Sequence, residues 1–273
     1  MFSVSHLIWI AVCTALIAVS LAVLLKRRPP LDRVMKVCLC IAVVSEFIKI
    51  GSVIEIVPMV DPVIEQAQGT YVLSYIPTGE YTPMMGVEHL PLELCSLQIF
   101  FIAIGCFTKS KRLRHSIYAL IYPTGVIGGV LGIVMATVTA YISTPREYFL
   151  SPRIWQYFLY HAMIVVLALY IGRSQDAGLV FSDWKIAVNG LIFLDIPTIY
   201  LNSLLSSRVY QHDQLVGVTH RINFFSSYVN PLGLILTSKW QWLLYLLIRA
   251  VLAFGLMVLF FVPLRKRGGS RNV

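Results

Sequence analysis

The chain has 273 residues, of which 58% are hydrophobic and 13% are charged, and its mean hydropathy is +0.77. A chain this apolar cannot cover itself with a polar surface, so the composition excludes a water-soluble globular protein and indicates a membrane protein. The formal net charge of +9 does not indicate nucleic-acid binding, because the basic residues lie in short segments beside helix ends, where anionic lipid headgroups are the nearer partner.

Seven apolar windows reach the roughly 18 residues that a membrane-spanning helix needs. In chain order they cover residues 6–25, 34–50, 90–108, 115–137, 153–172, 185–205 and 240–263. The second window is the weakest, because Glu46 and Lys49 interrupt its far end. We therefore predict an all-α, polytopic bundle of seven transmembrane helices that forms a single integral membrane domain over residues 1–273.

The distribution of basic residues predicts the orientation of this bundle. Most of the 22 Lys and Arg residues follow the first, third, fifth and seventh windows. Because basic residues mark the cytoplasmic side, the N-terminus is predicted outside the cell and the C-terminus in the cytoplasm. The predicted location is the cell membrane. In the first window the basic run KRR follows the apolar residues, so we expect a retained helix and not a cleaved secretory signal.

Two long connections, residues 51–89 and 206–239, are predicted on the external side. Prolines at 58, 62, 77, 83 and 91 exclude a continuous helix in the first connection. We expect a hairpin or a short amphipathic segment around TYVLSYIPTGEYT, residues 70–82. The second connection mixes polar and aromatic residues and is expected to rest at the membrane interface or to re-enter the membrane.

Small residues and thiols occur within the apolar windows. The fourth window contains PTGVIGGVLG, in which two pairs of glycines have four-residue spacing, Gly125 with Gly129 and Gly128 with Gly132. This spacing predicts close packing against a neighbouring helix. The five cysteines, at 13, 38, 40, 95 and 106, form neither a disulfide framework nor a zinc pattern, so no metal or other cofactor is expected.

Polar residues at membrane depth are the candidate functional residues, because a buried charge needs a partner or a wet cavity. Those within or beside the windows are Glu46, Glu93, Cys95, Gln98, His161, Asp195, Asn202 and Arg249. Most fall in the outward halves of their windows, which predicts a polar pocket that opens toward the outer leaflet and not a channel through the membrane. Structural roles are open for each: Cys95 and His161 as core residues, and Asp195 as a partner of backbone donors or Arg249.

A catalytic interpretation requires Cys95 and His161 to lie together. A thiol in hydrocarbon is a poor nucleophile until a neighbouring base takes its proton, and His161 is the candidate base. Pro91 at a helix start would place Cys95 within about two turns of a positive helix end. Tyr157 or Asp195 could orient the imidazole.

Three motifs carry a family resemblance. LPLELC opens the third window, YFLYHAMIV lies two windows later, and NFFSSYVNPLGLI precedes the last window. In this order they resemble the YwaF-like family of integral membrane proteins, whose eukaryotic branch is the transmembrane protein 164 family. The resemblance covers most of the chain from the third window onward, and the first two windows match by hydropathy.

The resemblance implies a phospholipid acyltransferase that works through a cysteine and a histidine, like the eukaryotic branch, which makes polyunsaturated ether phosphatidylethanolamine. By motif, these roles fall on Cys95 and His161, with a phospholipid donor and a lysophospholipid acceptor. Asn223 and Asn230 match polar positions before the last window, where they would contact a headgroup or cap a helix. Glu93 stands where the family typically has histidine, and a histidine occurs nearby at His89.

Two other function classes fit the same residues. One is a small-molecule carrier or substrate-binding protein with an outward polar pocket, and the other is a lipid-binding or assembly factor without turnover. The residues expected to contact a substrate are Glu46, Glu93, Gln98, Tyr157, Asp195, Asn202, Asn223 and Asn230.

Overall fold

The computed structural model describes residues 3–67, 70–136, 138, 144–211, 214–220, 222–226 and 238–265. Its helices are α1 (Val4–Arg27), α2 (Leu31–Val53), α3 (Leu94–Phe107), α4 (Lys111–Val134), α5 (Glu147–Leu150), α6 (Pro152–Arg173), α7 (Trp184–Leu205) and α8 (Lys239–Phe261). The strands are β1 (Glu55–Ala67), β2 (Thr70–Met84), β3 (Ser207–Gln211) and β4 (Gln214–His220). Short 3₁₀ helices are η1 (Val87–His89), η3 (Phe181–Asp183) and η4 (Phe224–Ser226).

Each of the seven predicted windows coincides with one long helix, and the helices are therefore confirmed. The start of α3 differs most, because the helix begins at Leu94 and not at residue 90. Pro91 disfavours a helical conformation in the residue before it, and Glu93 still has an extended backbone. Cys95 is consequently the second residue of α3 and lies in its first turn.

Five helical segments are long and apolar enough to cross a membrane within the described part of the chain. They are Val4–Arg27, Lys111–Val134, Pro152–Arg173, Phe181–Leu205 and Lys239–Arg265. Helix α2 carries several charged residues, and α3 has 14 residues, about 21 Å, against a hydrocarbon core of about 30 Å. The protein is a helical, multi-pass membrane protein, while the number seven and the orientation stay predictions.

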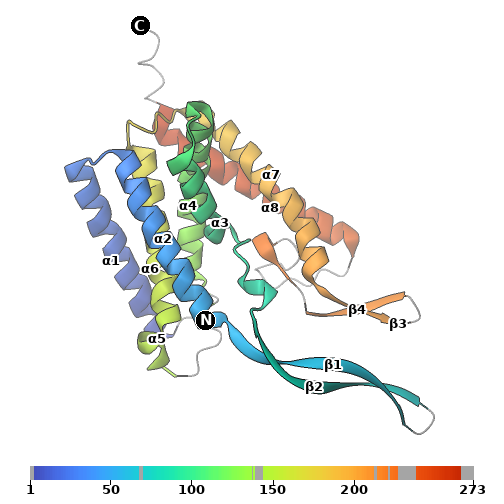
Figure 1. The fold of residues 1–273 in the computed structure, drawn as a ribbon. Coiled ribbons are helices and arrows are strands. Elements are labelled where there is room, and N and C mark those ends of the chain that lie inside the picture. The colour runs from blue at the N-terminus through green and yellow to red at the C-terminus, as the bar shows by residue number, and fades with distance from the viewer. Residues whose placement is uncertain are drawn as a thin grey trace.

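Helices α4 and α6 form the centre of the bundle, with α1 and α2 beside α6 and the pair α7 and α8 beyond α4 (Figure 1). The glycines of α4 explain this position. A Cβ atom added to Gly125 would lie 2.9 Å from the Cβ of Ala168, and one added to Gly129 would lie 2.9 Å from the carbonyl oxygen of His161. The predicted close packing at these glycines is confirmed, and the partner helix is α6.

Two antiparallel hairpins add strands to a fold that the sequence predicts as all-α. The pair β1 and β2 runs from Glu55 opposite Met84 to Ala67 opposite Thr70, with a register shift between Pro58 and Val60. It projects away from the helices (Figure 1). Residues 70–82, where a hairpin or a short amphipathic segment is expected, instead form most of β2, and the partner strand β1 lies earlier in the same connection. The pair β3 and β4 follows α7 directly.

Candidate functional site

Cys95 lies in the first turn of α3, next to α4 and α6. The hydroxyl group of Tyr160 on α6 donates a hydrogen bond to the Cys95 carbonyl oxygen at 3.0 Å. On the α4 side, a Cβ atom added to Gly128 would lie 3.7 Å from the Cys95 nitrogen and 3.9 Å from its Cβ. Helix α4 thus passes the start of α3 at a distance where a Cβ atom at position 128 would make an ordinary van der Waals contact with Cys95.

The imidazole of His161 is 3% exposed and occupies the space beside Gly132 of α4. A Cβ atom at Gly132 would overlap the Cδ2 and Nε2 atoms of the ring. The hydroxyl group of Tyr157 donates to the Gly132 carbonyl oxygen at 3.0 Å, and this bond ties α6 to α4 at the same level. A glycine is therefore required where the histidine ring meets the neighbouring helix.

Cys95 and His161 face the same side of α4. Gly128 and Gly132 are four residues apart, so they lie on consecutive turns of one helix face, with about 6 Å between the two positions. Gly128 meets Cys95 and Gly132 meets His161. We call this group of four residues the glycine seam. Tyr160 directly precedes His161 on α6, and its bond to the Cys95 carbonyl links α6 to α3 beside the seam.

A hydrogen bond to the backbone sets the protonation pattern of His161. Its Nδ1 atom lies 2.6 Å from the carbonyl oxygen of Tyr157. A carbonyl only accepts, so Nδ1 is the donor and the neutral ring carries its lone pair on Nε2. The Nε2 atom, which faces Gly132, can therefore accept a proton. Tyr157 orients the ring, as one of the two predicted candidates, but through its carbonyl and not through its hydroxyl group.

Gln98 is fully buried one turn after Cys95 on α3. Its Nε2 atom donates to the Leu94 carbonyl at 3.2 Å and to the Thr124 hydroxyl oxygen at 3.1 Å. Among the described residues its Oε1 atom has no hydrogen-bond partner. A buried acceptor without a partner is uncommon in folded proteins.

Glu46 belongs to a separate polar group between α2 and α6. Its Oε1 atom lies 2.6 Å from the buried ammonium group of Lys49. Across from α2, the Gln156 side chain of α6 donates to the hydroxyl oxygen of Ser45, the residue before Glu46, at 2.7 Å and accepts from Arg153. The charge of Glu46 is thus balanced within its own helix, at the i and i+3 spacing that places both side chains on one face.

The remaining charged candidates meet around η4. Arg249 of α8 forms an ion pair with Asp195 of α7 and donates to the Phe225 carbonyl oxygen at 2.6 Å. The Phe225 nitrogen donates to the Glu93 carboxylate at 3.4 Å. Phe225 has a φ of 57°, a left-handed conformation that is rare for an aromatic residue. The pairing of Asp195 with Arg249, one of the predicted alternatives, is confirmed.

Asn202 holds the same segment through two backbone bonds. Its Nδ2 atom donates to the Phe224 carbonyl at 2.9 Å, and its Oδ1 atom accepts from the Phe224 nitrogen at 2.8 Å. We call the group of Glu93, Asp195, Asn202, Arg249 and η4 the arginine network. Asn223 lies directly before η4 and is half-buried, whereas Asn230 lies outside the described residues.

Three features of this arrangement could not be predicted from the sequence. The contacts of Gly128 and Gly132 with the two candidate catalytic residues depend on helix rotation, which a spacing pattern does not fix. Phe225 gives no sign of a left-handed backbone. The bond from Tyr160 to Cys95 has one weak signal, an aromatic residue with a hydroxyl group next to His161 in the motif YFLYH.

Comparison with known proteins gives one family match. Residues 1–261 match the model of the TMEM164 family. No curated protein and no solved structure matches the chain significantly. The match includes the first two helices, where the sequence resemblance rests on hydropathy and not on a motif. It also covers both the glycine seam and the arginine network.

Proposed function

The chain belongs to the TMEM164 family of membrane proteins, and on this basis we propose that it is a membrane-embedded, thiol-dependent phospholipid acyltransferase. Cys95 is the nucleophile and His161 the general base. One observation carries the proposal: the two residues meet consecutive turns of one α4 face, at Gly128 and Gly132. Residues on opposed faces would not support it.

In the first half-reaction, the Cys95 thiol gives its proton to Nε2 of His161 and its sulfur attacks the ester carbonyl of a donor phospholipid. The C–S bond forms, the ester C–O bond breaks, and the departing lysophospholipid oxygen takes the proton back from His161. In the second half-reaction, His161 takes the proton of the lysophospholipid acceptor's hydroxyl group, whose oxygen attacks the thioester. The new ester C–O bond forms, the C–S bond breaks, and the departing Cys95 sulfur takes the proton back from His161, which restores the thiol and the neutral imidazole. An ester replaces an ester, so the cycle needs no oxidant and no nucleotide.

The position of Cys95 at the start of α3 favours this chemistry. The first backbone bond within this turn runs from the Leu97 nitrogen to the Glu93 carbonyl at 2.9 Å, so the amide groups of Cys95 and Ser96 precede it. Amide groups at a helix N-terminus stabilise a thiolate and the oxyanion of a tetrahedral intermediate. Gln98, with its buried acceptor oxygen, is the residue we assign to the hydroxyl group of a bound lipid.

The other candidate residues support the site from a distance. Tyr157 orients the base, and the arginine network fixes η4 against Glu93, two residues before the nucleophile. Glu46 holds the neighbouring Lys49. We assign these residues to positioning and not to contact with the reacting ester. Asn223 and Asn230 keep their assignment to headgroup contact or helix capping.

Purified protein in liposomes that contain a phospholipid with a labelled acyl chain and an unlabelled lysophospholipid tests the proposal. We expect acyl transfer and a mass increase of one acyl group on the wild-type protein. Both are lost in Cys95→Ala, while His161→Gln forms the acyl-protein at least about a hundredfold more slowly. Cys106→Ala, on the same helix, is the matched control and keeps both signals.

The result that would overturn the proposal is acyl transfer at the wild-type rate by Cys95→Ala. A carrier or lipid-binding protein, the alternative classes, would retain ligand uptake or binding in that variant. Equilibrium binding of lysophospholipid to Cys95→Ala, measured beside the transfer assay, separates these outcomes.

A further inference from the structure

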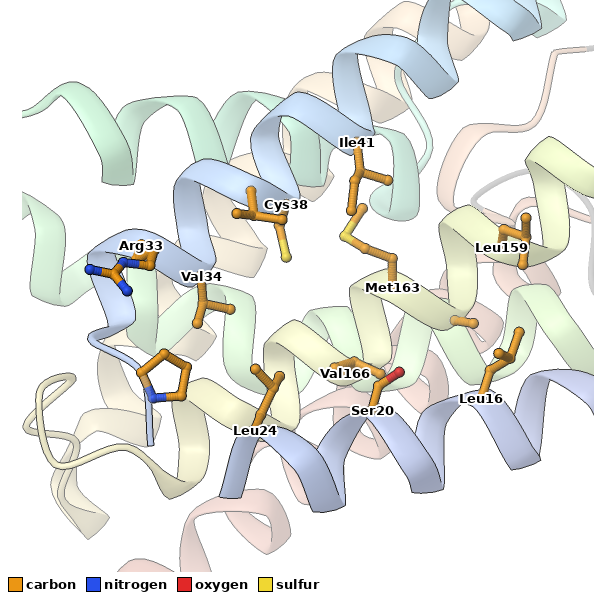
Figure 2. A pocket seen from close by; sticks show the side chains of 13 residues that line it. Leu16, Ser20, Leu24, Arg33, Val34, Cys38, Ile41, Leu159, Met163 and Val166 are labelled. Carbon is orange, nitrogen blue, oxygen red and sulfur yellow. The ribbon is translucent and has the colours of Figure 1, made fainter. Parts of the chain in front are cut away.

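A cavity of about 460 Å³ lies between α1, α2 and α6, apart from the glycine seam. Figure 2 shows it as a groove along the three helices, with Arg33 at one end and Leu16 and Leu159 at the other. Its lining is apolar except for the Ser20 hydroxyl group, the Cys38 thiol and the Arg33 guanidinium. The volume lies within the roughly 300–1,000 Å³ of small-molecule sites.

The length of the groove matches one leaflet of a bilayer. On α1 the lining runs from Leu16 to Leu24, and on α2 it runs from Arg33 to Ile41, which is about 12 Å along each helix. Half of a hydrocarbon core is about 15 Å. Because the groove follows the helix axes, an acyl chain that stands in the membrane lies along it without bending.

The end of the groove at the α1–α2 turn is basic. Lys26 and Arg27 occupy the last turn of α1, and Arg33 is exposed in the first turn of α2. Two carboxylates lie near this turn, and each has a partner other than Arg33. Asp32 forms an ion pair with Lys36 at 2.6 Å, and Asp176 accepts a hydrogen bond from the Leu31 nitrogen at 3.0 Å. Among the described residues, no ion pair is recorded for Arg33.

We propose that this groove binds one anionic phospholipid. Its phosphate group lies on the Arg33 guanidinium, and one acyl chain fills the groove toward Leu16 and Leu159. A guanidinium binds phosphate through two parallel hydrogen bonds, and basic pockets between transmembrane helices bind anionic headgroups. Arg33 is exposed at this end, so the headgroup reaches it from the leaflet at the α1–α2 turn.

This site is distinct from the proposed acyl-transfer centre. The headgroup end of the groove holds the ester groups of the bound lipid, whereas only the far end approaches Cys95. Met163 separates the two, because it lines the groove and also packs in the cluster that contains Cys95, Tyr160 and Ile164. The lipid is therefore bound as a ligand that bridges α1, α2 and α6, and its ester is not a substrate in this position.

Native mass spectrometry of the purified protein with phosphatidylglycerol and with phosphatidylcholine of identical acyl chains tests the proposal. We expect one tightly held phosphatidylglycerol, preferred about tenfold over phosphatidylcholine, and loss of that preference in Arg33→Gln. Lys36→Gln is the matched control, since Lys36 lies one turn further on α2 and does not line the groove.

A second pair of variants tests the groove itself. Ser20→Trp fills the cavity and should abolish the tight phosphatidylglycerol, whereas Val19→Trp, at a neighbouring position that is 64% exposed and outside the lining, should retain it. Gel filtration and thermal unfolding of each variant exclude misfolding as the cause. Because binding is measured without acyl transfer, this test is independent of the proposed function.

Two results would overturn the site. If the wild type and Arg33→Gln each bind phosphatidylglycerol and phosphatidylcholine equally, the bound lipid is ordinary annular lipid and the groove is not a specific site. Loss of preference in Arg33→Gln together with full binding by Ser20→Trp means a headgroup contact at the surface without an acyl-chain groove.

Discussion

The glycine seam and the arginine network both place polar groups inside an apolar bundle, but they use them differently. In the arginine network each charged or amide side chain is paired with a side chain of opposite charge or with a backbone group. Arg249, for example, forms an ion pair with Asp195 and donates a hydrogen bond to the Phe225 carbonyl. In the glycine seam, one nitrogen of His161 is fixed by a carbonyl and the other faces a glycine. Depth in the membrane is therefore not enough to identify a reacting group, and the pairing of each group must be known.

The packing around the two regions explains this difference. Within the most apolar 18 residues, 61% of α4 and 67% of α6 are buried, against 11% of α7 and 6% of α8. The seam is held by close contact of helix backbones at glycines. The pair α7 and α8 has little buried surface, so hydrogen bonds between helices and to η4 take over the role of packing.

The largest effect should come from closing the seam. Gly132→Ala places a methyl group on the imidazole of His161, so the ring must turn and its bond to the Tyr157 carbonyl is lost. We expect a loss of acyl transfer of at least about a hundredfold, the usual contribution of a general base. The initial rate in the liposome assay measures it.

Gly128→Ala is the matched control, because the added atom would lie 3.7 Å or more from Cys95, an ordinary contact. It should retain most of the activity. Equal losses in both variants would show that α4 tolerates no side chain at either position, and the seam would then be a packing feature only.

Breaking the ion pair of the arginine network should reduce the stability of the fold more than the rate of acyl transfer. Arg249→Gln leaves Asp195 and the Phe225 carbonyl without their charged donor, and we expect a decrease of about 2 kcal/mol in the free energy of unfolding. The side chains are 21% and 29% exposed, so the loss stays below that of a fully buried pair. Thermal or denaturant unfolding in detergent measures this change.

Two further variants make that test specific. Lys239→Gln, on the same helix but outside the network, should leave stability unchanged. The double variant Asp195→Asn with Arg249→Gln should lose less than the sum of the single losses, because one interaction is removed twice. Additive losses would show that the pair does not act as a unit.

A smaller effect is expected at Glu93, where the family resemblance of the motif LPLELC implies a histidine. The bond from the Phe225 nitrogen to Glu93 is long, at 3.4 Å, so Glu93→His should change unfolding by less than about 1 kcal/mol. A histidine nitrogen can accept the same bond, whereas Glu93→Leu cannot and should be the less stable of the two. Chemical denaturation of both variants provides the comparison. An inactive Glu93→His protein would mean that the carboxylate itself is needed.

The sequence alone predicts the helices and nominates the two residues that we propose react, and the reason is that both depend on local patterns. Apolar windows set the helices, and the motifs around Cys95 and His161 mark them. The rotation of α4, which brings Gly128 and Gly132 to these residues, depends on packing of whole helices. No local pattern contains that information.

The arginine network could be predicted only in part, for a related reason. An aspartate and an arginine inside apolar helices require partners, so pairing of Asp195 with Arg249 could be foreseen. The bonds of Asn202 to Phe224 could not, because they require η4 to return to α7 after the hairpin of β3 and β4. In the sequence, Glu46 and Lys49 stand out only as interruptions of the second window, and their ion pair at i, i+3 spacing is seen in the structure.

The smallest effect is expected at His89, the histidine nearest in sequence to Glu93, the position where the family resemblance implies a histidine. It lies in η1, outside α3, and burial lowers the pKa of its imidazole, an effect that Glu88 opposes in part. A pKa below the unfolded value of about 6.5 favours the neutral ring in the folded protein, so its contribution to stability is present at neutral pH and decreases as the pH falls below that value. His89→Gln should therefore keep acyl transfer at pH 7 and should lose slightly less thermal stability than the wild type between neutral pH and pH 5. A loss of activity as large as that of His161→Gln would instead show that His89 replaces the histidine that Glu93 displaces, and the catalytic centre would then extend beyond the glycine seam.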